Sequence, residues 1–72
     1  ALPILLANIN RNILLDEMAE YALRIKPGGH LLLSGFYQED VPLLLQEASD
    51  AGLTFISEKE KNRWTCLHLR KL

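Results

Sequence analysis

The polar residues that follow the first apolar run are the best candidates for chemistry in this 72-residue chain. Asn8 stands near the end of the run over residues 4–9, and Asn10 comes directly after it. An asparagine amide both accepts and donates hydrogen bonds, so it can orient an amino group for attack on a bound electrophile. The alternative is that Asn8 or Asn10 only caps the helix that follows.

Ser34, Gly35 and Trp64 are further candidates because of their places in the predicted strands. In an open α/β sheet, ligands bind outside the carboxyl ends of the strands, so Ser34 and Gly35 should face the same edge as Asn8. They either line a ligand cleft there, or Gly35 simply permits the turn. Trp64 either packs in the core or at a sheet edge, or it touches a substrate.

The remaining reactive side chains predict no further site. His30 and His68 are far apart in the chain, and no cysteine or carboxylate stands at metal-ligand spacing to either, so we expect no metal site. Cys66 lies within an apolar strand and is expected to be a small core residue. Ser34 lacks the flanking pattern of a nucleophile elbow.

Composition and charge exclude several classes of protein. The chain is 49% hydrophobic and 24% charged, which is typical of a globular domain. Its net charge of −1 argues against nucleic-acid binding driven by phosphate contacts. A single cysteine predicts a reducing compartment, the cytoplasm. No apolar run approaches the ~20 residues of a membrane helix, so we expect no membrane partner.

The hydrophobic pattern predicts an α/β domain in the order strand, helix, strand, helix, strand, strand. Nearly continuous apolar runs indicate strands buried on both faces at 4–9 and 30–34. Apolar residues at helical spacing predict the two helices, with Gly52 as the left-handed cap of the second. The predicted parallel sheet ends in one antiparallel hairpin strand. The remaining segments are a helix-to-strand turn at 26–29, a strand at 53–57, a charged turn at 58–62 with Asn62 at its tip, and a last strand at 63–70.

The chain opens at a strand that reads as an inner one, which predicts that residues 1–72 are a fragment of a larger domain. Three segments together resemble the end of one family, the methyltransferases that act on the eleventh protein of the large ribosomal subunit. These use S-adenosylmethionine and belong to class I. The segments are Ile4-Leu5-Leu6-Ala7-Asn8-Ile9, Lys26-Pro27-Gly28-Gly29-His30-Leu31-Leu32-Leu33-Ser34-Gly35 and Glu60-Lys61-Asn62-Arg63-Trp64.

The resemblance implies a Rossmann-like seven-stranded sheet of which this chain supplies the fourth to seventh strands. The last strand would then lie between the fifth and the sixth. The resemblance makes Asn8 the catalytic residue, which holds the substrate nitrogen in line with the methyl sulfonium, and places Asn8 and Ile9 at the cofactor. The residues expected to line the substrate are Asn10, Ser34, Gly35 and Trp64.

The chain departs from the family pattern because the cofactor-binding N-terminal half is absent. The glycine-rich first loop and the acidic residue after the second strand are missing, as is the domain that recognises the ribosomal protein. We therefore expect the chain alone neither to bind S-adenosylmethionine tightly nor to methylate its ribosomal protein partner. Two alternatives are a class relative with another substrate, and a non-catalytic α/β interaction module that pairs through its exposed first strand.

Overall fold

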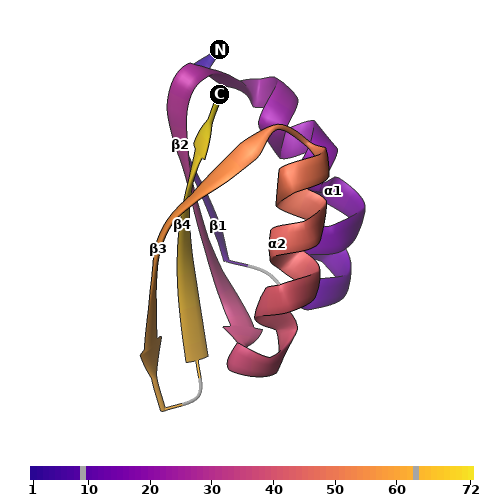
Figure 1. Ribbon diagram of the computed structural model, residues 1–72, viewed down its shortest axis with the longest axis vertical. Coiled ribbons are helices and arrows are strands. Elements are labelled where there is room, and N and C mark those ends of the chain that lie inside the picture. The colour runs from indigo at the N-terminus through magenta and orange to yellow at the C-terminus, as the bar shows by residue number, and fades with distance from the viewer. Residues whose placement is uncertain (9, 63) are drawn as a thin grey trace.

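Two helices cover one face of a four-stranded sheet (Figure 1). The computed structural model describes residues 1–8, 10–62 and 64–72. In chain order the elements are β1 (Leu2–Asn8), α1 (Arg11–Arg24), β2 (Ile25–Tyr37), the short 3-10 helix η1 (Gln38–Asp40), α2 (Val41–Asp50), β3 (Leu53–Lys61) and β4 (Trp64–Lys71).

The strands lie in the order β1-β2-β4-β3. β1 and β2 are parallel, whereas β4 runs antiparallel to both of its neighbours. The last strand of the chain therefore inserts between the second and the third. This confirms the predicted α/β fold and the strand order that the resemblance implied.

α1 begins at a side-chain cap and buries one stripe. The Asn10 Oδ1 accepts a hydrogen bond from the backbone N–H of Ile13 at 3.1 Å, which satisfies one of the free donors of the first turn. The predicted apolar stripe of this helix is fully buried. Its members are Leu14, Met18, Tyr21, Ala22 and the adjoining Ile25.

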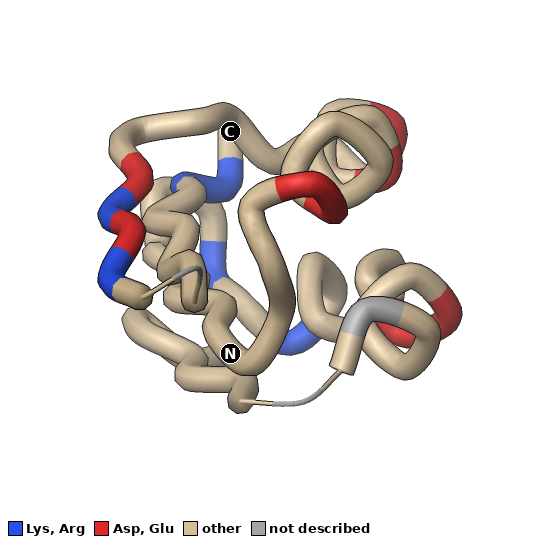
Figure 2. Tube along the Cα trace, turned by 90° about the horizontal axis from the view of Figure 1, so that it is seen from below, with Lys and Arg blue, Asp and Glu red and all other residues tan. Residues whose placement is uncertain are grey.

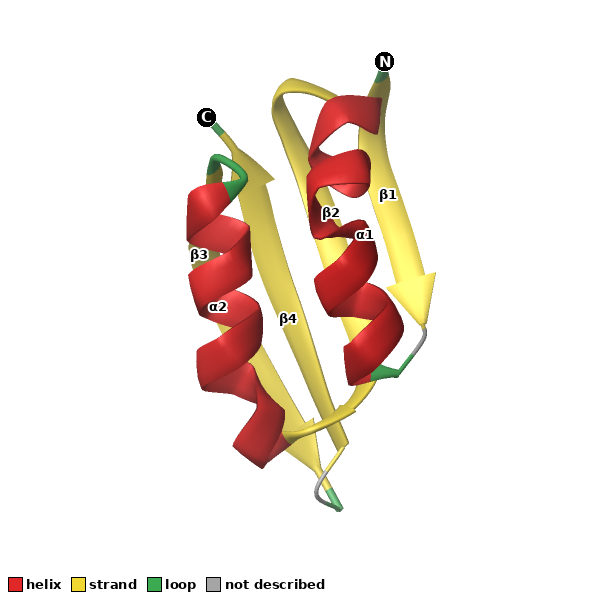
Figure 3. Cartoon of the chain, turned by 90° about the vertical axis from the view of Figure 1, so that its right-hand side faces the viewer, coloured by secondary structure: helices red, strands yellow, loops and turns green. Residues whose placement is uncertain are grey.

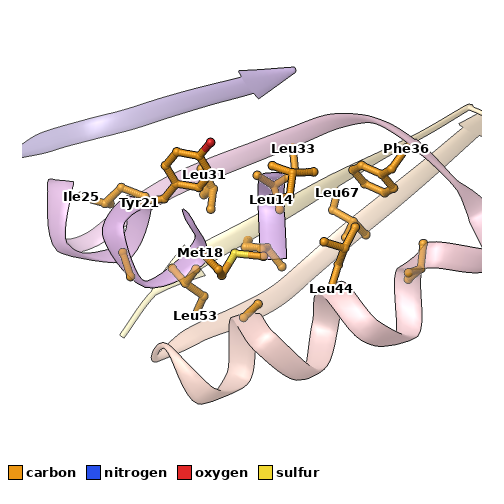
Figure 4. Close-up of a cluster of buried hydrophobic side chains, with 14 residues drawn as sticks. Leu14, Met18, Tyr21, Ile25, Leu31, Leu33, Phe36, Leu44, Leu53 and Leu67 are labelled. Carbon is orange, nitrogen blue, oxygen red and sulfur yellow. The ribbon is translucent and has the colours of Figure 1, made fainter. Parts of the chain in front are cut away.

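The core lies between the two helices and the sheet face that they cover (Figure 4). Leu44 and Ala48 of α2 meet Leu14 and Met18 of α1 over leucines of the central strands. Gly52 follows α2 with φ +85°, so a glycine ends this helix in the left-handed region, as predicted. The strand residues in this cluster are Ile25, Leu31, Leu33, Phe36, Leu53, Leu67 and Leu69.

β2 is longer than the predicted strand at 30–34. It begins directly after α1, and the predicted turn at residues 26–29 is a bulge within it. Leu2 pairs with Ile25 and Ile4 pairs with His30, so two steps along β1 match five along β2. The long apolar run predicted the strand correctly, but the proline and glycines interrupted the pattern before its true start.

The prediction of a charged turn over residues 58–62 is wrong for most of its length. Glu58, Lys59, Glu60 and Lys61 continue β3 and pair with β4. β3 lies at the sheet edge with its polar side chains exposed, and charged side chains on an edge strand oppose further pairing. Only the tip was placed correctly, since Asn62 has φ +53°.

The prediction that the first two strands are buried on both faces is also wrong for these residues. Both helices lie over the same side of the sheet (Figure 3). The other side, which we call the open face, has no covering layer in the described residues, and Leu6 is 70% exposed there. The open face includes Ile4, Leu6, His30, Leu32, Ser57, Lys59, Cys66, His68 and Arg70.

Candidate functional site

A hollow of about 790 Å³ lies where β1 and β2 end and the β3–β4 hairpin turns. Asn8 and Ser34 are paired across the parallel strands, and both line it. Gly35 lies beside them, and Trp64 enters from the hairpin. The structure thus brings together four of the six residues that the sequence singled out, at the strand edge where α/β sheets bind ligands.

Asn10, a fifth predicted site residue, does not line this hollow. Asn10 uses its side-chain oxygen to cap α1, and it lines a smaller hollow of about 280 Å³ with Tyr37 and Asp40. Gly35 borders both hollows. Ile9 lies outside the described residues.

Trp64 is half exposed and stacks on Tyr37. The ring centroids are 4.9 Å apart and the planes are inclined by 21°. Tyr37 lines the smaller hollow and Trp64 the larger, so the stacked pair stands between the two. Trp64 is therefore neither buried in the core nor on an edge strand. Its ring forms one wall of the larger hollow.

Sequence reasoning missed the residues that complete the larger hollow. Lys59, Glu60 and Lys61 were assigned to a solvated turn, yet they line it from β3, whose alternating charges are visible in Figure 2. Thr65 and Cys66 line it from β4. Cys66 was predicted to be a core residue, but it is exposed, because alternate residues of β4 face the open side of the sheet.

A short hydrogen-bond chain joins the end of β2 to the hairpin. The Thr65 hydroxyl donates to the Gln38 Oε1 at 3.1 Å. The Gln38 Nε2 donates to the Glu58 Oε2 at 2.8 Å. One amide of η1 therefore contacts both strands of the hairpin that walls the hollow.

The two histidines lie together on the open face despite their separation in sequence. The His30 Nδ1 and the His68 Nε2 are 2.9 Å apart, because β2 and β4 are neighbours. No group of three metal-binding side chains occurs among the residues that the structure describes. Within the same residues, no helix has the length and apolar character needed to cross a bilayer.

The fold is that of the C-terminal part of an α/β methylase. It superposes on the crystal structure of the ribosomal protein L11 methylase from Lactobacillus delbrueckii subsp. bulgaricus with a TM-score of 0.88. The match covers 97% of this chain and 37% of that chain, at 24% sequence identity. At this identity the likeness establishes the fold alone.

Sequence comparison gives the family. The family model described as ribosomal protein L11 methyltransferase matches residues 1–72. The ribosomal protein L11 methyltransferase of Bacteroides thetaiotaomicron is 52% identical over 64 residues, and that of Porphyromonas gingivalis is also 52% identical over 64 residues. This chain belongs to the ribosomal protein L11 methyltransferase family, as the resemblance indicated.

These matches cover most of this chain but a small part of each relative. They take in 89% of this chain, 23% of the Bacteroides protein and 22% of the Porphyromonas protein. The chain thus spans about a quarter of the length of the curated relatives that it matches.

Proposed function

We propose that this chain is the C-terminal portion of an S-adenosylmethionine-dependent protein N-methyltransferase whose substrate is a ribosomal protein. Family membership supports the reaction class, and the names of the relatives support ribosomal protein L11 as the substrate. The cytoplasmic location inferred from the sequence stays a prediction.

The observation that carries the proposal is the position of Asn8. It ends β1, is exposed, and opens on the hollow that Ser34, Gly35 and Trp64 also line. Its amide oxygen can accept a hydrogen bond from a substrate N–H and turn the nitrogen lone pair toward the reacting carbon. Such orientation lowers the barrier by proximity and needs no acid or base from the chain.

The residues of this chain fit the part of such a reaction that binds and orients the substrate amine. S-adenosylmethionine supplies an electrophilic methyl group on a sulfonium. With that group bound, the neutral amine of the substrate would form the new N–C bond as the C–S bond breaks, and the proton of the resulting ammonium would pass to solvent. The chain contributes orientation by Asn8 and a wall by Trp64. No glycine-rich loop that opens a helix occurs in this sequence, so the phosphate-loop type of ligand cradle is not part of it.

The sheet supports a partner of a definite kind, the N-terminal half of the same fold. β1 is an edge strand without a charged side chain, and its Leu2, Ile4 and Leu6 are exposed. An uncharged edge strand with exposed leucine and isoleucine side chains is a feature that proteins bury. We propose that the missing half pairs with β1 and covers the open face.

The test is a graft into a full-length relative. The matching segment of the Bacteroides thetaiotaomicron relative is replaced by these 72 residues, and methyl transfer from labelled S-adenosylmethionine to ribosomal protein L11 is measured. We expect an active enzyme, and we expect Asn8→Ala to lower its kcat about 100-fold, as a loss of substrate alignment does.

Asn12→Ala is the matched control. Asn12 is an exposed asparagine of the first turn of α1 that lines the smaller hollow and not the larger one, so its removal should leave kcat within about twofold if the effect belongs to Asn8. The 72-residue chain by itself should transfer no methyl group. An inactive graft that folds, or an Asn8→Ala graft as active as its parent, would contradict the proposal.

A further inference from the structure

We propose that Gln38 is a positioning residue: it latches the β3–β4 hairpin to the end of β2 and thereby holds Trp64 as the wall of the hollow beside Asn8. The contacts of Gln38 with the hairpin support the latch itself. The effect of the latch on a substrate rests in addition on the proposed function.

The need for a latch arises from the way in which β2 and β4 pair. Leu33 pairs with Leu67 and Phe36 pairs with Thr65, so three steps along β2 match two along β4. The extra residue falls at Ser34-Gly35, where Gly35 has φ +95°. A bulge of this kind bends the strand and interrupts its ladder of hydrogen bonds. The floor of the hollow is therefore also the weak point in the attachment of the hairpin.

Beyond the bulge the ladder resumes at the pairs Phe36–Thr65 and Tyr37–Trp64, and two side-chain contacts reinforce it there. Tyr37 and Gln38 are consecutive, and so are their partners Trp64 and Thr65. Tyr37 stacks on Trp64 with ring centroids 4.9 Å apart. Gln38 accepts the hydrogen bond of the Thr65 hydroxyl at 3.1 Å. The stacking contact and the hydrogen bond thus hold two adjacent residues of β4.

The amide of Gln38 suits both of its partners. Its oxygen accepts from Thr65 of β4, and its NH₂ group donates to the carboxylate of Glu58 in β3 at 2.8 Å. A glutamate in its place would set two carboxylates against each other, and a leucine would make neither bond. One neutral side chain therefore ties both strands of the hairpin.

The burial of Thr65 makes the contact specific. Thr65 is 2% exposed and is the one polar residue among the buried residues that the structure describes. A buried hydroxyl without a partner is costly, so the hairpin is held where Gln38 can reach it. Trp64 precedes Thr65 directly and takes its orientation from this anchor.

The consequence for a substrate is a wall of fixed position. An indole ring offers a flat apolar surface on which the methylene stem of a long amine-bearing side chain can lie. With the wall fixed, the nitrogen at the end of the stem is presented toward Asn8. Loosening the wall should weaken substrate binding more than it slows the chemical step.

The first experiment reads Trp64 directly, because it is the single tryptophan of the chain. Fluorescence quenching by acrylamide is measured for Gln38→Leu and for the parent. We expect the quenching constant to rise about twofold as the indole gains mobility and exposure. Gln46→Leu is the matched control: it removes an exposed glutamine bonded to Asp50 on α2, and should leave quenching unchanged.

A second pair of variants keeps the test sharp if Gln38→Leu does not fold. Thr65→Val removes the hydroxyl and should raise quenching, whereas Thr65→Ser keeps it and should restore the parent value. Circular dichroism establishes that each variant is folded. Folded Gln38→Leu or Thr65→Val proteins with the quenching constant of the parent would overturn the latch.

The second experiment uses the grafted enzyme. Gln38→Leu should raise KM for the ribosomal protein about fivefold and leave kcat within about twofold, the signature of lost binding that is equal in ground and transition states. An unchanged KM would overturn the role of the latch toward substrate. If the graft itself is inactive, the proposed function fails, and the quenching data alone still decide whether the latch exists.

Discussion

The His30 Nδ1 and the His68 Nε2 lie 2.9 Å apart on the open face, and each ring is half-buried. The ring planes are inclined by 47°, so the two imidazoles meet through their nitrogens rather than by stacking. A neutral ring carries one N–H donor and one acceptor nitrogen, so the pair makes one hydrogen bond across β2 and β4.

Replacing one histidine of this pair should destabilise the chain, because the other keeps a half-buried nitrogen without its partner. We expect His30→Leu to lower the free energy of unfolding by about 1 kcal/mol. The double variant, with His30→Leu and His68→Leu, should lose less free energy of unfolding than the sum of the losses of the two single variants. We expect a coupling of about 0.5–1.5 kcal/mol in a double-mutant cycle measured by urea unfolding. The same cycle between His30→Leu and Gln46→Leu should give a coupling near zero.

A charge introduced on the open face should affect the stability of the isolated chain and of the grafted enzyme differently. Leu6 is 70% exposed, so Leu6→Lys should change the stability of the 72-residue chain by about 0.5 kcal/mol or less. In the grafted enzyme the same lysine would be buried by the N-terminal half and should cost several kcal/mol. Leu43→Lys, at an exposed position of α2, should be neutral in both settings. Equal effects of Leu6→Lys in the two proteins would show that this face stays uncovered.

Tyr21 should make the chain sensitive to alkali. Burial raises the pKa of its hydroxyl, and the hydrogen bond to Glu17 and the charge of that carboxylate raise this pKa further. The neutral phenol is thus favoured in the folded state. Its contribution to stability is present below the ordinary pKa of about 10 and is lost as the pH rises through the higher folded value.

Urea unfolding at a series of alkaline pH values checks this expectation. The parent should lose stability above about pH 10, and Tyr21→Phe should lose less over the same range. Tyr37→Phe keeps the Tyr21 hydroxyl and should show the decline of the parent. A Tyr21→Phe curve parallel to that of the parent would contradict the assignment.

The sequence predicted the helices and their ends well, because the apolar pattern there reflects burial in the core between the helices and the sheet. The stripe from Leu14 to Ile25, the cap at Asn10 and the left-handed Gly52 all follow from local rules, and all are present. The insertion of β4 between β2 and β3 follows from no local pattern. It came from the resemblance to a family, since pairing order is decided by contacts between distant segments.

The errors have a common physical origin in segments without a second covering layer. Residues 58–61 are charged on both faces because β3 lies at an edge, and such a strand has the composition of a turn. Strand direction alone could have indicated their place at the hollow: β3 runs parallel to β1, so its carboxyl end lies at the same end of the sheet as Asn8. Cys66 was assigned to the core because its strand is apolar, although alternation places it on the open face.

The place of β4 sets the order in which this sheet can be completed. Among the residues that the structure describes, β3 pairs with β4 alone, and the pair β1–β2 is joined to β3 through β4. During synthesis, β3 can therefore pair with its neighbour of this sheet only once residues 64–71 have left the ribosome. The joining of the two halves of the sheet is a late, non-local event, and such pairings are slow and expose strands meanwhile. Within these 72 residues, the strand that comes last in the sequence is the one that joins β3 to the rest of the sheet.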